Sequence, residues 1–270
     1  MFRTYVLSPL RAALALCGAL ALALAAMIAM PLHAPPPLES ILKGARALDW
    51  SGAPPLAYFT ARDGTQLAYR RYPAEGAATG QTAVVIHGSV GNSLNAHATA
   101  ATLARDGIEA VAPDMRGHGA SGTRGDVAYI GQSEDDLADL LDALKPSTKP
   151  VLVGHSMGGG FALRVARGPL ADRFARYVLV APFLGVDAPT TRPSAGWAQA
   201  NTPRIVALAL LHGLGIDCCG DLPVIAFALP EGARRYATTR YSFRLLSSFG
   251  VRDARYRDLS DVRAPIEIVA

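Results

Sequence analysis

The sequence of 270 residues contains only three cysteines, which limits the cross-links and metal sites that it can form. Three cysteines are too few for a disulfide framework, and a bridge between the adjacent Cys218 and Cys219 would be strained. The third, Cys17, lies in an apolar N-terminal stretch. No group of cysteines and histidines has the spacing of metal ligands. We therefore expect no metal site, and no other motif implies a cofactor.

Charge is also scarce, and it follows no pattern along the chain. Charged residues make up 18% of the sequence, and the net charge of +4 comes from scattered arginines. Because no basic stripe alternates with aromatic side chains, we do not expect a nucleic acid partner. Half of the residues are apolar, which is typical of a globular chain. This length suits one large α/β domain, with or without a cap.

The longest uncharged stretch runs from residue 12 to residue 30 and follows Arg3 and Arg11. As a helix it is long enough to cross a hydrocarbon core of about 30 Å. A cleavable signal peptide has a shorter apolar region of about 7–15 residues, and the sequence after Met30 is a poor cleavage site. We therefore expect residues 1–34 to anchor the protein in a membrane, with secretion after signal cleavage as the alternative. Arg3 and Arg11 favour an N-terminus on the inner side, although Lys43 and Arg46 on the far side weakly oppose it. We therefore expect the domain on the periplasmic side of a bacterial inner membrane.

Strand and helix patterns alternate through the middle of the chain, which predicts βαβ units and a mostly parallel sheet. Asp63-Gly64 between two β-type runs predicts a hairpin. We expect strands at residues 82–86, 108–112, 151–153 and 177–180, and helices at residues 95–106 and 133–144, the second capped by Ser133. The predicted units are a proline-rich linker (35–55), a core (56–183), a cap with an apolar helix at 204–211 (184–262) and a returning core strand (263–270).

The segment around Ser156 carries the clearest chemical motif. A short β-branched run leads into Gly154-His155-Ser156-Met157-Gly158, and small residues with helical spacing follow. A strand, a sharp turn and a helix in this order are the context of a nucleophile elbow. A side chain at Gly154 or Gly158 would collide where the strand and helix approach each other, and a strained turn would lift the Ser156 hydroxyl clear of the sheet. A plain turn is the alternative. A phosphate loop is excluded because no Gly-x-x-x-x-Gly-Lys-Ser/Thr occurs.

Two more motifs follow predicted strands: His87-Gly88-Ser89 after 82–86, and the segment from Asp114 to Ser121 (Asp-x-Arg-Gly-x-Gly-x-Ser) after 108–112. With the elbow, they make residues 56–270 resemble the serine α/β-hydrolases. Within that superfamily the chain is similar to membrane-anchored bacterial hydrolases of the lysophospholipase and monoglyceride lipase type. The resemblance implies an α/β-hydrolase fold, with a mostly parallel central sheet, a cap insertion and a preceding transmembrane helix.

The resemblance also implies a role for each matching residue. Ser156 would be the nucleophile, and the backbone N–H groups of Ser89 and Met157 would form the oxyanion hole. Four residues would shape the elbow and the loop after the strand at 82–86, namely His87, Gly88, Gly154 and Gly158. The implied reaction cleaves a lipid ester or a small carboxylic ester through an acyl-enzyme. A serine nucleophile argues against epoxide hydrolysis, which uses a carboxylate in this fold. An acyltransferase, a peptidase and a binding protein without catalysis stay open as alternatives.

The catalytic acid and histidine are missing from their usual places. In this family they follow the nucleophile in that order, yet no histidine occurs after His212. His212, in the predicted cap, and Asp187, shortly after the strand at 177–180, are reserve candidates. We expect the acid and the histidine to lie beyond Ala270 in a longer chain.

Overall fold

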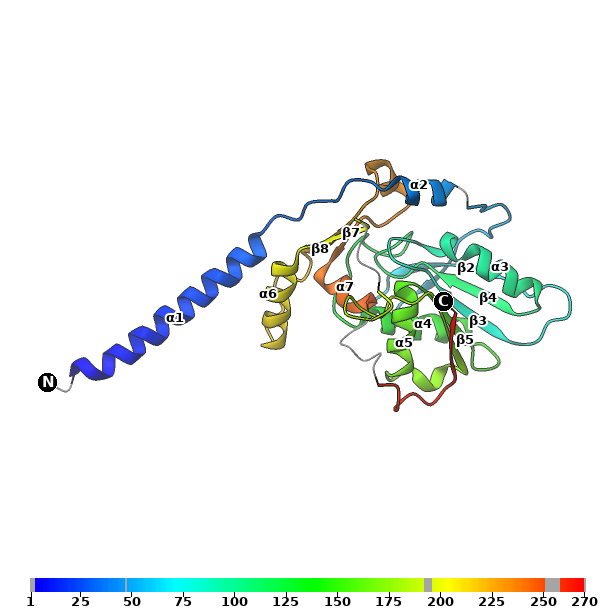
Figure 1. Ribbon diagram of the computed structural model, residues 1–270. Helices are drawn as coiled ribbons and strands as arrows, with labels where there is room; N and C mark the ends of the chain where they lie inside the picture. The colour runs from blue at the N-terminus through cyan, green and yellow to red at the C-terminus, as the bar shows by residue number, and fades with distance from the viewer. Residues whose placement is uncertain (1–2, 47, 192–195, 251–257, 270) are drawn as a thin grey trace.

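The computed structural model describes residues 3–46, 48–191, 196–250 and 258–269, and a seven-stranded sheet forms its centre (Figure 1). The strand order is β1-β2-β4-β3-β5-β6-β10. The strands from β4 to β10 in this order pair in parallel, whereas the β1/β2 and β2/β4 pairs are antiparallel. The mostly parallel sheet and the hairpin are thus confirmed. The strands are β1 (Ala57–Thr60), β2 (Gln66–Tyr72), β3 (Thr82–Ile86), β4 (Glu109–Pro113), β5 (Val151–His155), β6 (Arg176–Val180) and β10 (Ile266–Val269).

Helices cover both faces of this sheet, and alternate side chains of β3 enter different apolar clusters. Val84 and Ile86 pack in the larger cluster with α4 (Gln132–Leu144) and α5 (Met157–Ala166). Ala83 and Val85 pack in the smaller cluster with α3 (His97–Arg105). This cover on both faces is the reason that β3 is a continuous apolar run. The β5 strand lies between β3 and β6, so its carboxyl end, where Ser156 follows, lies in the middle of one sheet edge.

Two helix starts differ from the sequence prediction. The expected cap at Ser133 is wrong: α4 begins after Gly131, which has a φ of 106°, and Ser133 is buried inside the first turn. Burial of this turn against the core overrides the local capping signal. The helix expected at 95–106 is divided into a short 3₁₀ turn, η1 (Ser93–Ala96), and α3, because Asn92 caps the earlier turn.

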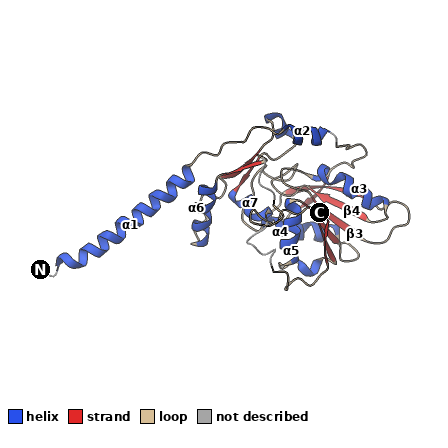
Figure 2. Cartoon of the chain, in the orientation of Figure 1, coloured by secondary structure: helices blue, strands red, loops and turns tan. Residues whose placement is uncertain are grey.

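The predicted cap contains more regular structure than its sequence indicates. The apolar helix is confirmed as α6 (Thr202–Gly213), but a separate antiparallel sheet and a second helix were not predicted (Figure 2). Leu245 and Phe249 of the second helix pack in the main core cluster, which joins the cap to the core. Residues 251–257 of the predicted cap lie outside the described residues. The added elements are β7 (Ala198–Ala200), β8 (Pro223–Phe227), β9 (Arg240–Ser242) and α7 (Phe243–Phe249).

The N-terminal segment forms a long helix, α1 (Arg3–Ala29), which extends away from the rest of the molecule (Figure 1). Its part from Pro9 to Ala29 is long and apolar enough to cross a membrane. A membrane anchor and a signal peptide both fit this finding. The predicted linker at residues 35–55 is not wholly irregular, because it contains α2 (Glu39–Arg46). The Leu38 N–H just before this helix donates to the Ala228 carbonyl of the cap at 3.1 Å, so the linker rests on the cap.

Candidate active site

Ser156 occupies a strained turn between β5 and α5. Its φ of 53° and ψ of −116° are rare for a residue with a side chain. Two hydrogen bonds hold the turn against the end of β6 and the loop that follows it. The Ser156 N–H donates to the Val180 carbonyl at 2.9 Å, and the Phe183 N–H donates to the Ser156 carbonyl at 2.8 Å. Strain of this kind persists where the surroundings impose it, and it is concentrated at functional sites.

The two glycines of the motif permit this turn because the surrounding backbone leaves no room for a side chain. A β-carbon on Gly154 would overlap the Gly158 carbonyl oxygen. A β-carbon on Gly158 would lie 2.5 Å from the carbonyl oxygen of His87. The backbone is therefore closely packed around Ser156, where the end of β5, the first turn of α5 and the loop after β3 meet.

The loop after β3 packs against the serine through Gly88. A β-carbon on Gly88 would lie 3.3 Å from the Cβ atom of Ser156, so the two residues are in direct contact. Neither the Ser89 N–H, which follows in the loop, nor the Met157 N–H donates to another described residue. The Met157 amide opens α5, where the helix dipole favours negative charge. Two unengaged amides next to a serine hydroxyl can stabilise an oxyanion.

His87 is buried, and both of its ring nitrogens already have backbone partners. Its Nδ1 lies 2.7 Å from the Gly88 carbonyl oxygen and donates to it, while its Nε2 accepts from the Met115 N–H at 3.2 Å. Burial lowers the pKa of this imidazole. A neutral histidine in this arrangement holds two loops together and has no nitrogen left for a proton from Ser156.

His118 is equally buried and connects to the cap. Its Nε2 lies 2.7 Å from the Tyr241 hydroxyl, and its Nδ1 lies 3.3 Å from the Arg116 carbonyl oxygen. Burial, together with the adjacent His87, lowers the pKa of His118 well below its ordinary value. Because the Tyr241 oxygen also accepts from the Val90 N–H, the chain of hydrogen bonds ends one residue from Ser89. The sequence carries no local sign of this connection.

The Asp114 motif braces the loops around the site. The Asp114 carboxylate accepts from the Ser93 N–H at 2.7 Å and from the Ala120 N–H at 2.8 Å. The buried Arg116 makes two hydrogen bonds of 2.7 Å to the Asp136 carboxylate on α4. The motif thus ties the loop after β4 to η1 and to α4.

The remaining candidates lie apart from these contacts. Asp187 is exposed in the loop after β6, on the same sheet edge as Ser156. The Nδ1 of His212 lies 2.6 Å from the Asp217 carboxylate, and both side chains are exposed on the cap. The Ser156 hydroxyl makes no hydrogen bond to another described residue. In the described part of the chain, therefore, no histidine is hydrogen-bonded to the Ser156 hydroxyl.

This arrangement agrees with a comparison to protein families. The model of the Hydrolase_4 family, described as serine aminopeptidase, S33, matches residues 78–227, which include the loop after β3 and the Ser156 turn. The chain belongs to this family. The recognition of an α/β-hydrolase from the three motifs is thereby confirmed.

Curated relatives of this S33-family chain match only part of its length. An sn-1-specific diacylglycerol lipase ABHD11 of Xenopus tropicalis is 33% identical over 142 residues, which are 52% of this chain and 40% of the relative. An epoxide hydrolase of Caballeronia sordidicola is 37% identical over 108 residues, or 39% and 32% of the two chains. The chain thus spans less than half the length of these relatives.

Solved structures confirm the α/β-hydrolase fold. A soluble variant of monoglyceride lipase from Saccharomyces cerevisiae superposes with a TM-score of 0.61 at 19% identity, covering 82% of this chain and 78% of that one. A monoacylglycerol lipase of Paleococcus ferrophilus gives a TM-score of 0.54 at 23% identity, covering 75% and 76%. At these identities the likeness shows the fold alone.

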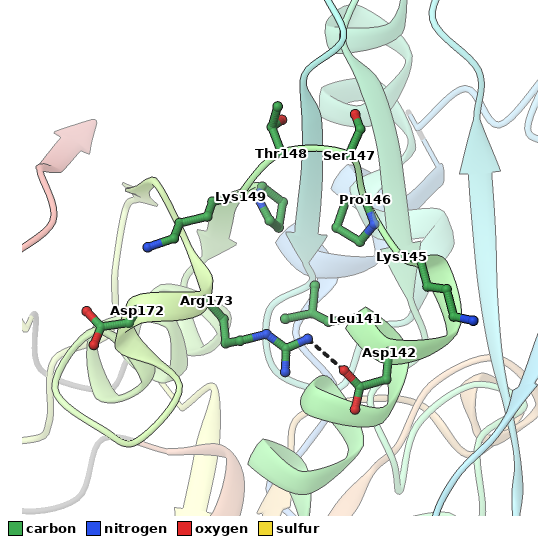
Figure 3. Close-up of a pocket in the computed structure, with 10 residues that line it drawn as sticks. Leu141, Asp142, Lys145, Pro146, Ser147, Thr148, Lys149, Asp172 and Arg173 are labelled. Atoms are coloured by element: carbon green, nitrogen blue, oxygen red, sulfur yellow. Dashed lines mark hydrogen bonds and ion pairs between the residues drawn. The ribbon is translucent and has the colours of Figure 1, made fainter.

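A pocket of about 590 Å³ in this S33-family chain, whose lining residues are drawn in Figure 3, does not include the serine. It is lined by the end of α4 and by residues that precede β5, such as Lys149, and an ion pair of 2.7 Å joins its residues Arg173 and Asp142. Ser156 follows the other end of β5, about 16 Å further along at 3.3 Å per residue. This pocket is therefore separate from the Ser156 site.

Proposed function

We propose that this protein is a serine hydrolase that cleaves acyl esters through an acyl-enzyme on Ser156. Its substrates would be lysophospholipids, monoglycerides or small carboxylic esters. The observation that supports the proposal is the Ser156 turn itself, a strained serine between β5 and α5 that packs against the Gly88 loop. We assign the oxyanion hole to the N–H groups of Ser89 and Met157, which donate to no other described residue. A serine at this position also favours an ester over an epoxide as the substrate.

The proposed reaction assigns one task to each group. The Ser156 oxygen attacks the ester carbonyl and gives its proton to a general base, and the carbonyl oxygen becomes an oxyanion between the amides of Ser89 and Met157. The intermediate then expels the alcohol, which takes the proton from the base, and leaves an acyl-serine that water hydrolyses. Loss of one oxyanion donor typically costs about 10²–10³ in kcat, so these amides are central to the rate.

The base must come from a residue other than the buried histidines. His87 and His118 use both ring nitrogens elsewhere, and protonating either one would place a charge in a buried site. We therefore assign the acid and the histidine to chain outside the described residues. Asp187 stays in reserve as the acid because it lies on the sheet edge of Ser156, and His212 stays in reserve as the base.

We also infer that α1 is retained as a membrane anchor, with the domain on the periplasmic side. The buried Arg204 of α6 donates from Nε to the Ile28 carbonyl at 2.7 Å and from Nη2 to the Met30 carbonyl. The Asn201 amide also donates to Met30, at 2.9 Å. Cleavage after α1 would remove Ile28 and leave a buried guanidinium with fewer partners, so the fold favours retention. A membrane-tethered enzyme meets lipid esters directly.

A fluorophosphonate probe tests the proposed nucleophile in the protein made from its complete reading frame. We expect labelling and turnover of p-nitrophenyl esters in the wild type, and loss of both in Ser156→Ala, where turnover falls on the order of 10⁶-fold. Ser147→Ala is the matched control, because Ser147 is exposed at the other end of the sheet.

Three other outcomes would redirect the assignment. Labelling that survives in Ser156→Ala contradicts the nucleophile. No labelling of the complete protein favours a binding protein. Faster turnover of an aminoacyl p-nitroanilide than of any ester, with the same Ser156 dependence, favours a peptidase. The mass of the purified protein tests retention of the anchor, since a mature chain that lacks residues 1–34 would contradict it.

A further inference from the structure

Helix α6 exposes an apolar stripe on the outer side of the cap. Val206 and Leu210 lie four residues apart in α6 and are 43% and 53% exposed. Leu214, which follows the last residue of α6, is 73% exposed, and the nearby Ile216 is 48% exposed. Residues four apart lie on the same face of a helix. No Asp, Glu, Lys or Arg occurs from residue 205 to residue 216. A helix on the surface of a soluble domain ordinarily carries polar side chains on its outer face.

The same helix is apolar on its inner face as well. Ala207 and Leu208 are buried, and Leu208 packs with Val224 and Phe243 of the cap. The cap core is therefore complete without the outer stripe. At twelve residues α6 is too short to span a bilayer, for which about 20 residues are needed. With its inner face packed on the cap, α6 leaves its apolar outer face for a contact with another apolar surface.

The first turn of α6 is attached to the end of α1, and this attachment locates the stripe. The last carbonyls of a helix have no partners within it, and α1 has no basic residue in its last turn to satisfy them. Arg204 supplies that charge from α6, and it donates at the same time to the Pro223 carbonyl of the cap at 2.6 Å. Ile28, in the last turn of α1, packs against the same cap cluster as Leu208.

These contacts hold α6 where α1 leaves the apolar layer. Figure 1 shows α6 beside the inner end of α1, with both helices on the side of the molecule away from the core sheet. We propose that the stripe of Val206, Leu210, Leu214 and Ile216 inserts into the lipid surface that α1 enters. The stripe would thus contact the bilayer at the boundary between the headgroups and the acyl chains. The inference rests on the proposed retention of α1 as an anchor.

The insertion would give the protein two attachments to the membrane with different roles. The helix α1 anchors the chain, whereas α6 fixes the orientation of the cap on the lipid surface. Arg204 then acts as the joint between the two, since it binds both the end of α1 and the cap. A lipid ester in the bilayer would meet the cap at this surface.

Depth-dependent quenching tests the insertion. The full-length protein, with Cys17, Cys218 and Cys219 replaced by serine, is reconstituted in phosphatidylcholine–phosphatidylglycerol vesicles with one fluorophore on a new cysteine. We expect Leu210→Cys and Leu214→Cys labels to shift to shorter emission wavelengths and to lose fluorescence with nitroxide-bearing acyl chains. A label at Ser147→Cys, on the far end of the core, should show neither change.

A label at Leu20→Cys in α1 separates this proposal from the proposed anchor. Quenching at position 20 without quenching at position 210 overturns the insertion of α6 and leaves the anchor intact. Quenching at position 210 alone would contradict the anchor, and it would overturn the proposal that the stripe enters the same lipid surface as α1. Disulfide formation between position-210 cysteines of two copies, in place of quenching, overturns the proposal in favour of a dimer contact.

A second readout follows the enzyme on two kinds of substrate. Leu210→Gln should lower the turnover of monoglyceride presented in vesicles and leave the turnover of a soluble p-nitrophenyl ester unchanged. An equal fall on both substrates would contradict a lipid contact and indicate damage to the fold.

Discussion

The hydroxyl oxygen of Tyr241, in the cap strand β9, accepts a hydrogen bond of 2.6 Å from the backbone N–H of Val90 in the core. Val90 has a φ of 61°, an unusual value for a β-branched residue. The cap also holds the other side of this residue, because the Thr238 N–H donates to the Val90 carbonyl at 3.0 Å. The cap therefore fixes a strained backbone position next to Ser89.

Removal of the Tyr241 hydroxyl should impair the proposed oxyanion amide. In Tyr241→Phe the Val90 N–H loses its acceptor, and we expect kcat to fall roughly tenfold, the equivalent of one hydrogen bond of about 1.4 kcal/mol, with little change in KM. Steady-state kinetics on a p-nitrophenyl ester measure this. Thr238→Val is the control, because it removes the Thr238 hydroxyl and keeps the N–H that binds Val90.

A double variant distinguishes positioning from general damage. Glycine adopts a positive φ without strain, so Val90→Gly should restore part of the activity lost in Tyr241→Phe. If the loss of kcat in the double variant equals the combined losses of the two single variants, Tyr241 does not act by positioning Val90.

The glycines of the Ser156 turn should tolerate no side chain. We expect Gly158→Ala to lower the free energy of unfolding by about 3 kcal/mol, because its β-carbon would lie 2.5 Å from the His87 carbonyl oxygen and force the backbone apart. Thermal unfolding in detergent measures the change. Gly213→Ala in α6 is the matched control, since nothing lies within 4 Å of its β-carbon. Equal melting temperatures for both variants would contradict the geometry of the turn.

The sequence predicts the site where its determinants are local. The Ser156 turn could be predicted because five consecutive residues dictate it, and the same holds for the hairpin at Asp63-Gly64. The Tyr241–Val90 contact joins residues 151 positions apart, and the Arg204–Ile28 contact joins residues 176 apart. The local sequence pattern around each residue gives no information about a partner so far along the chain, so these contacts could not be predicted.

Other errors came from local signals that tertiary structure overrides. Ser133 has the right neighbours for a helix cap, but the core buries it. The strands β7 and β9 have three residues each, which is too short for an alternating pattern to show. The domain boundaries stay predictions.

The buried ion pair of Arg116 should contribute far more to stability than an exposed one. Arg116→Met leaves the buried Asp136 carboxylate without its partner, and we expect a loss of about 3–5 kcal/mol in the free energy of unfolding. Arg173→Met breaks the exposed pair with Asp142 and should cost at most about 1 kcal/mol. Thermal unfolding of both variants measures the difference, and similar losses would contradict the structural role of the Asp114 motif.

Acid should destabilise the fold through His118. Its pKa is lowered by burial, and so it stays neutral in the folded protein, whereas an unfolded chain takes up a proton below its ordinary pKa of about 6.5. Stability is therefore fully present above pH 6.5 and falls as the pH drops below it, by up to about 1.4 kcal/mol per pH unit for this histidine. Melting temperatures from pH 7.5 to pH 5 should show a shallower decline in His118→Gln than in the wild type. Replacement of the exposed His33 by glutamine should leave the slope unchanged, and a wild-type slope in His118→Gln would show that another group carries the acid sensitivity.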